Sequence, residues 1–159
     1  MDPERVNRWL TLGANIGVLA GIGLLIFELQ QNREMIRGQT RTQLAQGVSE
    51  LLTANMSDAA YASILHRGNR GEQLTDLEQY QYDRQRNAFI AYFENVVYQY
   101  EIGLYDTNEF SHHMAVIAGD LDRNPGIRTH WCKNRDRMSK ELVELVEAQA
   151  TKKPCPVSK

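Results

Sequence analysis

The chain has 159 residues, a formal net charge of −2 at pH 7 and hydrophobic residues at 42% of its positions. This length leaves room for one compact domain beside a membrane segment. The small net charge excludes the basic surface that nucleic-acid binding needs, so we expect no nucleic-acid partner. The two cysteines, Cys132 and Cys155, fit neither a zinc spacing nor a disulfide framework, so we expect Cys155 to carry a free thiol.

An uncharged apolar stretch over residues 10–27 follows Trp9. At a rise of about 1.5 Å per residue, this stretch and its two flanking residues come close to the ~30 Å hydrocarbon core of a bilayer. A buried helix of a soluble protein is the alternative, but an uncharged run this long disfavours it. No A-x-A-like cleavage site follows. We therefore predict an uncleaved transmembrane helix over residues 9–29, behind an N-terminal tail over residues 1–8.

One face of the predicted anchor carries glycines at a spacing of four, at Gly13, Gly17 and Gly21. Small residues at this spacing let a second membrane helix approach closely. Asn15 lies one turn from them, and its amide needs a hydrogen-bond partner in hydrocarbon. The alternative is that glycine is simply common in transmembrane helices. We predict a helix-packing groove made of these three glycines and Asn15.

The arginines that flank the anchor number two before it, Arg5 and Arg8, and three after it, Arg33, Arg37 and Arg41. The positive-inside rule therefore favours a cytoplasmic C-terminal domain. The three later arginines recur every four residues and share one helix face, which we call the arginine face. The arginine face is suited to contact with lipid phosphates or with an acidic partner. A helix face that is simply exposed to water explains the same spacing of arginines equally well.

After the anchor we expect a stalk helix over residues 30–56. Its first apolar stripe consists of Leu44, Val48, Leu51 and Leu52. A soluble helical bundle over residues 57–150 follows, and an irregular tail over residues 151–159 ends the chain. Helices are expected over residues 59–66 and 76–102, then after Asp106, and finally over residues 127–150.

The starts and stops of these helices are predicted from short local signals. Ser57-Asp58 and Asp106 suit N-caps, and Thr75 with Glu78 forms a capping box. Gly103 suits a helix stop, and Pro125 suits a first helical turn. The aromatic stripe of the 76–102 helix predicts core rather than a cofactor site; it comprises Tyr82, Phe89, Phe93, Val96 and Tyr100.

No segment alternates with period two over the length of a strand. The sequence therefore predicts an all-α protein, in which one N-terminal transmembrane helix continues into a stalk and a small bundle of roughly three to four helices.

Three motifs add a resemblance. They are a Trp9-led anchor followed by Q-Q-N-R at residues 30–33, G-L-Y-D at residues 103–106, and P-G-I-R-T-H-W at residues 125–131. This layout resembles a widespread set of uncharacterised bacterial membrane-anchored proteins, over about residues 9–147. The resemblance implies a bacterial inner membrane, and it implies no activity or functional residue.

Candidate metal ligands are few and incomplete. Glu109 and His112 have the E-x-x-H spacing of ferritin-like di-iron sites, but a second E-x-x-H is absent. Adjacent residues point about 100° apart on a helix, so His112 and His113 do not readily share a metal. His130 and Cys132 diverge further. We expect no metal, no cofactor and no catalytic residue.

The sequence leaves two main hypotheses of function from different classes, and a third with less support. The first is a non-catalytic accessory or scaffold subunit of a larger membrane complex, whose partners are other membrane protein subunits and the lipid bilayer. The second is a membrane protein that assembles with itself through the glycine groove. The third, a helical metalloenzyme, has the least support because its ligand set is incomplete.

Overall fold

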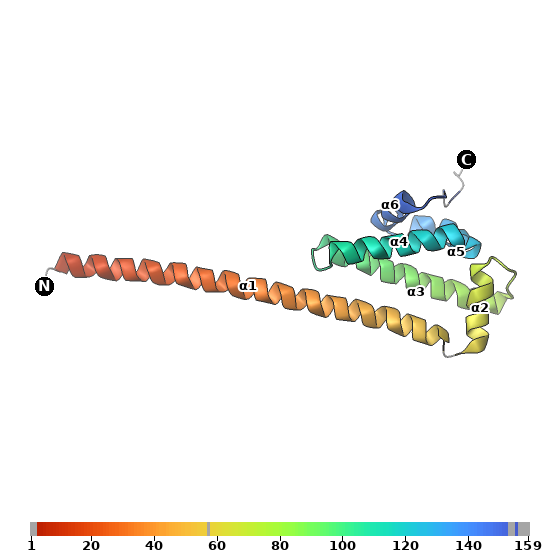
Figure 1. Cartoon of the computed structure of the whole chain (residues 1–159), viewed down its shortest axis with the longest axis horizontal. Coiled ribbons are helices and arrows are strands. Elements are labelled where there is room, and N and C mark those ends of the chain that lie inside the picture. The colour runs from red at the N-terminus through yellow and green to blue at the C-terminus, as the bar shows by residue number, and fades with distance from the viewer. Residues whose placement is uncertain (1–2, 57, 153–154, 156–159) are drawn as a thin grey trace. The chain divides into compact units, whose positions relative to one another are not determined.

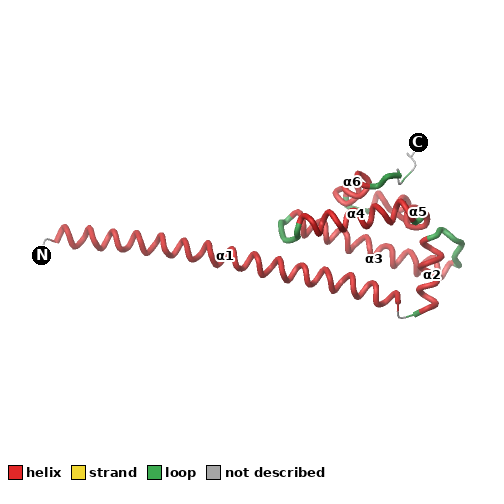
Figure 2. The backbone as a smooth tube through the Cα atoms, in the orientation of Figure 1, coloured by secondary structure: helices red, strands yellow, loops and turns green. Residues whose placement is uncertain are grey.

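The computed structural model describes residues 3–56, 58–152 and 155, and the regular elements in these residues are all helical (Figure 1, Figure 2). The elements are α1 (Pro3–Met56), α2 (Ala59–Asn69), α3 (Asp76–Glu101), α4 (Thr107–Arg123), α5 (Pro125–Asn134), a 3₁₀ turn η1 (Arg135–Arg137) and α6 (Lys140–Gln149). The predicted all-α class, with a long N-terminal helix followed by a helical bundle, is confirmed.

The chain divides into two units, Met1–Gln39 and Thr40–Lys159. In the first unit α1 is an exposed apolar helix, and none of its apolar window is buried inside the protein. It is long and apolar enough to cross a membrane. α1 runs without a break through the predicted tail, anchor and stalk, so the limits of these three segments stay predictions.

The second unit, which we call the compact unit, begins with the last part of α1. Leu44 is only 4% exposed and joins the main core, against which Val48 and Leu51 are partly buried. Leu52 is 47% exposed. The remaining fully buried core residues come from α3, α4, α5 and α6, and include Val96, Met114, Leu121, Trp131, Leu142 and Val146. Of the predicted stripe of α3, Phe93 and Val96 lie in this core, and Phe89 and Tyr100 pack against it. Tyr82 instead joins a second, smaller cluster with Ile64 and Leu65 of α2.

The predicted helix caps are present. The Asp58 carboxylate accepts from the Ala60 amide at 2.8 Å, whereas Ser57 lies outside the described residues. The Thr75 amide donates to Glu78 Oε2 at 2.9 Å, and Glu78 donates its own amide to Thr75 Oγ1 at 3.4 Å. Each cap supplies an acceptor to backbone amides that have no partner within the helix.

The predicted single helix over residues 127–150 is wrong. In the structure α5 ends at Asn134, and α6 begins only after Ser139. The Ser139 hydroxyl caps the Leu142 amide at 3.4 Å, and the Ser139 amide donates to Glu94 Oε1 on α3 at 2.8 Å. A side chain far away in the sequence therefore stabilises the break, and five α-helices follow α1 in the described residues. α2 is also longer than predicted and ends at Asn69.

Glycines let three helices approach closely at one end of the compact unit. A Cβ on Gly126, in the first turn of α5, would lie 1.7 Å from the carbonyl oxygen of Gly68 in α2. A Cβ on Gly68 would lie 2.4 Å from the ring of Tyr82 in α3. These two positions exclude any larger side chain, so they fix how α2, α3 and α5 meet.

Candidate functional site

The predicted groove is an open surface in the structure. A Cβ added at Gly13, Gly17 or Gly21 would meet no atom within 4 Å outside its own helix turn. Asn15 on the same helix is exposed. The three glycines therefore leave room for a neighbouring helix, and whether one binds there stays a prediction. The expected place of Asn15 beside them is wrong, because a residue two positions from Gly13 and Gly17 in one continuous helix points about 200° away from them.

The arginine face divides between the two units. Arg37 pairs with Glu34 at 3.0 Å within the first unit, where Arg33 is exposed. Arg41 belongs to the compact unit and pairs with Glu109 of α4 at 2.5 Å. The Glu109 amide donates to the Asp106 carboxylate at 3.1 Å, as part of the N-cap of α4. The Glu109 carboxylate, however, holds the end of α1 to α4.

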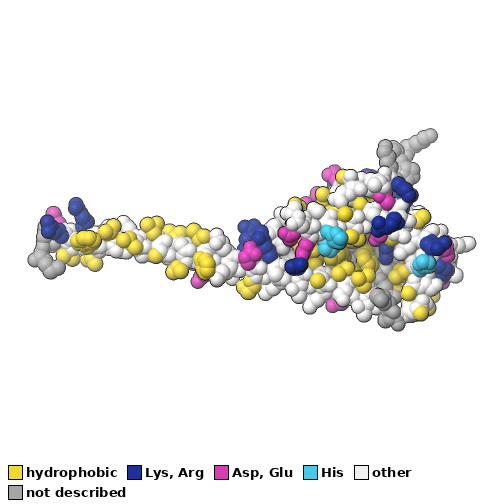
Figure 3. Space-filling view, in the orientation of Figure 1, with side chains coloured by type: hydrophobic (Ala, Val, Ile, Leu, Met, Phe, Trp, Pro, Cys, Tyr) yellow, Lys and Arg dark blue, Asp and Glu magenta, His cyan; other side chains and the backbone are white. Residues whose placement is uncertain are grey.

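A cleft in the compact unit is a feature that the sequence did not indicate. It has a volume of about 410 Å³, and its walls come mainly from the end of α1 and from α3, α4 and α5, with Asn69 at the end of α2. The lining includes Leu52, Arg86, Phe89, Val116, Ile127 and Trp131. The space-filling view shows apolar side chains in a hollow of this face, with histidine beside them (Figure 3). Sites for small molecules commonly have ~300–1,000 Å³ and mostly apolar walls.

Arg86 is the cation in the wall of this cleft. Its Cζ atom lies 4.9 Å from the ring centroid of Phe89 and 5.6 Å from that of Tyr82. Its Nε atom is buried without a hydrogen-bond partner. Burial lowers the pKa of Arg86, partly offset by Tyr82 and Asp120, and raises the pKa of Tyr82 to about 12. The guanidinium remains charged because its ordinary pKa is so high.

The histidines near the cleft are held by internal hydrogen bonds. His113 Nδ1 lies 2.8 Å from the carbonyl oxygen of Glu109, so Nδ1 carries the proton and donates it. His113 Nε2 then accepts from the Tyr92 hydroxyl at 3.4 Å. Both ring nitrogens are therefore engaged, and this arrangement positions the aromatic side chains between α3 and α4.

His130 is 5% exposed and lies between α5 and α3. Its Nδ1 donates to Asp83 Oδ1 at 3.1 Å. Its Nε2 has two possible partners. In the neutral ring Nε2 accepts from the Asn134 side-chain amide, whose nitrogen is 3.3 Å away. In the protonated ring Nε2 donates to Asn87 Oδ1, which is 3.0 Å away. Burial lowers the pKa of His130, and Asp83 partly offsets the effect. In the described part of the chain, no three His, Cys, Asp or Glu side chains are grouped to hold a metal ion.

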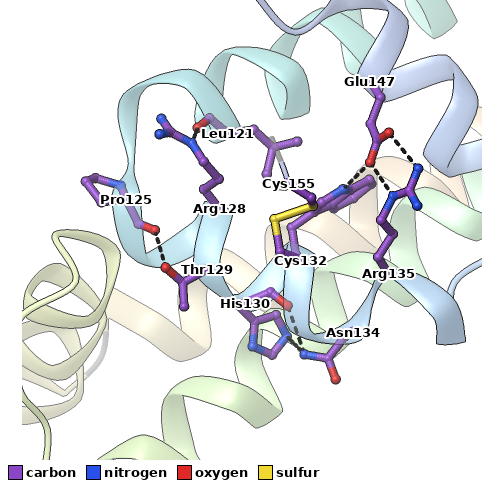
Figure 4. Close-up of a disulfide and its surroundings, with 11 residues drawn as sticks. Leu121, Pro125, Arg128, Thr129, His130, Cys132, Asn134, Arg135, Glu147 and Cys155 are labelled. Atoms are coloured by element: carbon purple, nitrogen blue, oxygen red, sulfur yellow. Dashed lines mark hydrogen bonds and ion pairs between the residues drawn. A yellow bond between two sulfur atoms is a disulfide. The ribbon is translucent and has the colours of Figure 1, made fainter. Parts of the chain in front are cut away.

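The expectation of a free thiol at Cys155 is wrong, because Cys132 and Cys155 form a disulfide (Figure 4). Their Cα atoms are 5.3 Å apart although 23 positions separate them in the sequence. The return of the chain depends on Asp122, whose carboxylate accepts from the amides of Thr151 and Lys152 at 2.9 and 3.0 Å. Residues 153–154 and 156–159 of the predicted irregular tail lie outside the described residues. Spacing alone carries no signal for this pairing.

No family model, no curated protein and no solved structure matches the chain. The motifs behind the resemblance have structural roles here. Gly103 has a φ of 74° after α3, and Gly126 makes the close approach to α2. Arg128 donates to the carbonyl oxygens of Leu121 and Asp122 at the end of α4, at 3.0 and 2.9 Å. Two of the three motifs therefore mark corners of the fold, and the one at residues 125–131 also supplies Ile127 and Trp131 to the cleft.

Proposed function

We propose that this protein is a non-catalytic, membrane-anchored accessory or scaffold subunit of a larger membrane complex, in a bacterial inner membrane. The observation that carries the proposal is the part of α1 in the first unit, where the helix is apolar and its large apolar side chains are exposed. Exposed apolar side chains on this scale need lipid or another protein. The proposed docking surface is the groove of Gly13, Gly17 and Gly21.

The proposed docking surface follows from the attractions that act between helices in a lipid bilayer. Lipid tails are as apolar as the helix, so apolar burial does not drive helices together in a bilayer. Close packing over small residues and interhelical hydrogen bonds remain as attractions. The three glycines permit the first. Asn15 points away from the glycine face, so close packing is the attraction that this docking surface offers.

The experiment compares Gly17→Ile with Val18→Ile. Ile at position 17 should insert into the bilayer at least as well as Gly, because Ile is more favourable in hydrocarbon. It should nevertheless release the partner, because its side chain blocks close approach of the two backbones. Val18 points about 100° away on the helix and serves as the control. The measurement is co-purification of other membrane proteins at matched membrane levels.

Three outcomes are informative. Loss of a different membrane protein with Gly17→Ile alone supports the accessory subunit. Loss of homo-oligomers alone supports the self-assembling alternative instead. Migration of the native protein as a lone monomer, or equal retention by both variants, overturns docking through this groove.

Two observations bear on the orientation of the anchor in the membrane, and they favour opposite orientations. The flanking arginines favour a cytoplasmic compact unit, but only by three to two. Disulfides are rare in the cytosol and persist in oxidising compartments such as the bacterial periplasm. A margin of one arginine is the weaker argument, so we propose that the compact unit lies outside the cytoplasm, and the Cys132–Cys155 disulfide supports this orientation.

A further inference from the structure

We propose that the cleft between α1, α3, α4 and α5 binds a small carboxylic acid with an apolar body, and that Arg86 pairs with its carboxylate. This proposal is independent of the docking function of the anchor. It rests on the compact unit alone, in which all of the lining residues lie.

The apolar body of the ligand is inferred from the walls. Phe89 and Trp131 present aromatic surface, and Leu52, Val116 and Ile127 present aliphatic surface. Leu52 and Val116 are 47% and 41% exposed, so a ligand in the cleft would remove apolar area from water. Flat aromatic molecules fit best because they pack against aromatic side chains with a gain beyond area burial.

The acid group is inferred from Arg86. In the described residues Arg86 makes no ion pair and no hydrogen bond, and its buried Nε is left without a partner. A buried donor in this state costs free energy unless a ligand or water supplies the acceptor. The planar guanidinium matches a carboxylate through two parallel hydrogen bonds. The Phe89 and Tyr82 rings hold the guanidinium in place from the protein side.

Three of the other polar side chains in the cleft wall already have partners. Asp120 pairs with Arg123 at 3.2 Å, which offsets the repulsion that its charge would exert on an acid. His113 and His130 have partners at both ring nitrogens. Arg86 is the one Arg or Lys side chain among the residues that line the cleft, so the ligand charge that the wall favours is negative.

The test uses the full chain in lipid nanodiscs, with empty nanodiscs subtracted. Calorimetric titration compares naphthoate with naphthamide, which has the same shape and no charge. Wild-type protein should bind naphthoate about tenfold or more tightly than naphthamide, as a charge-assisted hydrogen bond requires. Arg86→Gln should remove this difference, and Arg84→Gln, an exposed position on the same helix, should retain it.

Val116→Trp provides a second variant that keeps Arg86. The larger side chain fills the cleft from a half-exposed position, so the fold should tolerate it and binding of both compounds should be lost. If Arg86→Gln does not fold, this variant and the preference of the wild type for naphthoate still decide the question. Equal binding of the two compounds by the wild type, absence of binding, or full binding by Val116→Trp would each overturn the proposal.

Discussion

Cys132 of α5 is covalently joined to Cys155, which follows the last helix and brings the end of the described chain back onto α5 (Figure 4). Asp122 holds the same segment at a second point, through the amides of Thr151 and Lys152. The pKa of Asp122 is lowered to about 2, first by its hydrogen bonds with Thr151. Thr151, Lys152 and Cys155 are thus held against α4 and α5.

Reduction of the disulfide should destabilise the protein. The bond closes a loop with a sequence separation of 23, for which loss of unfolded-chain entropy corresponds to about 3 kcal/mol. We expect a correspondingly lower free energy of unfolding in a thiol reductant, measured by denaturant unfolding followed by circular dichroism. The double variant Cys132→Ala/Cys155→Ala is the control and should not respond to the reductant. An identical response of both proteins would show that the bond is absent in solution.

The compartment of the compact unit can be measured with a single introduced thiol. In the double variant Cys132→Ala/Cys155→Ala, we expect Glu144→Cys, at an exposed position of α6, to react with an impermeant maleimide in intact cells. The native cysteines are unsuitable reporters because they are bonded to each other. Labelling only after lysis would contradict our placement and restore the orientation that the arginine count favours.

Local signals in the sequence predict most of the helix boundaries. Thr75 and Glu78 are three residues apart, and their reciprocal hydrogen bonds require nothing from the rest of the fold. Gly103 likewise ends its helix through its own backbone conformation, with a φ of 74°. Both features are therefore readable before any tertiary contact is known.

The features that the sequence did not predict depend on distant contacts. The break before α6 uses Glu94, which lies 45 positions before Ser139, while the apolar period through Leu142 and Val146 continues regardless. The cleft that Arg86 lines is formed only where residues of five helices meet. Periodicity places Phe89 on the inner face of α3, but it does not reveal that a space remains beside it.

Gly126→Ala tests the close approach of α5 to α2. The new Cβ would overlap the carbonyl oxygen of Gly68, a backbone atom that cannot rotate away. We expect a loss of about 1–3 kcal/mol or more in stability, as for other overpacked sites. Gly47→Ala is the matched control, because a Cβ there meets no atom within 4 Å, and it should stabilise α1 by up to about 1 kcal/mol. Similar melting temperatures for the two variants would contradict this packing.

His130 should titrate below the ordinary pKa of histidine, because burial disfavours its charged form. Nuclear magnetic resonance of the ring measures this directly. Asp83→Asn should lower the pKa further, since the Asp83 carboxylate favours the protonated ring. Glu101→Gln, at the exposed end of the same helix, should leave the pKa unchanged. An upward shift in Asp83→Asn would mean that Asp83 does not face the imidazole in solution.

The same shift predicts how stability depends on pH. The unfolded chain takes up the proton near its ordinary pKa of about 6.5, whereas the folded chain takes it up only at lower pH. The stabilising contribution of neutral His130 is therefore fully present above this value and declines as the pH falls through the lower, folded-state pKa. The melting temperature should decrease over this interval, and more steeply in Asp83→Asn than in the wild type.

The end of α1 belongs to the compact unit because of Leu44, which is 4% exposed within the main core. Leu44→Ala should therefore cost about 2–5 kcal/mol, as buried leucine truncations do. Leu52→Ala, on the same helix but 47% exposed, is the control and should cost far less. A chain that begins at residue 57 should likewise be less stable than one that begins at residue 40, because it lacks Leu44 and the Arg41–Glu109 ion pair. Both comparisons use denaturant unfolding followed by circular dichroism. Equal stability within both pairs would show that the stalk does not pack against α3 and α4, and the cleft would then lack its α1 wall.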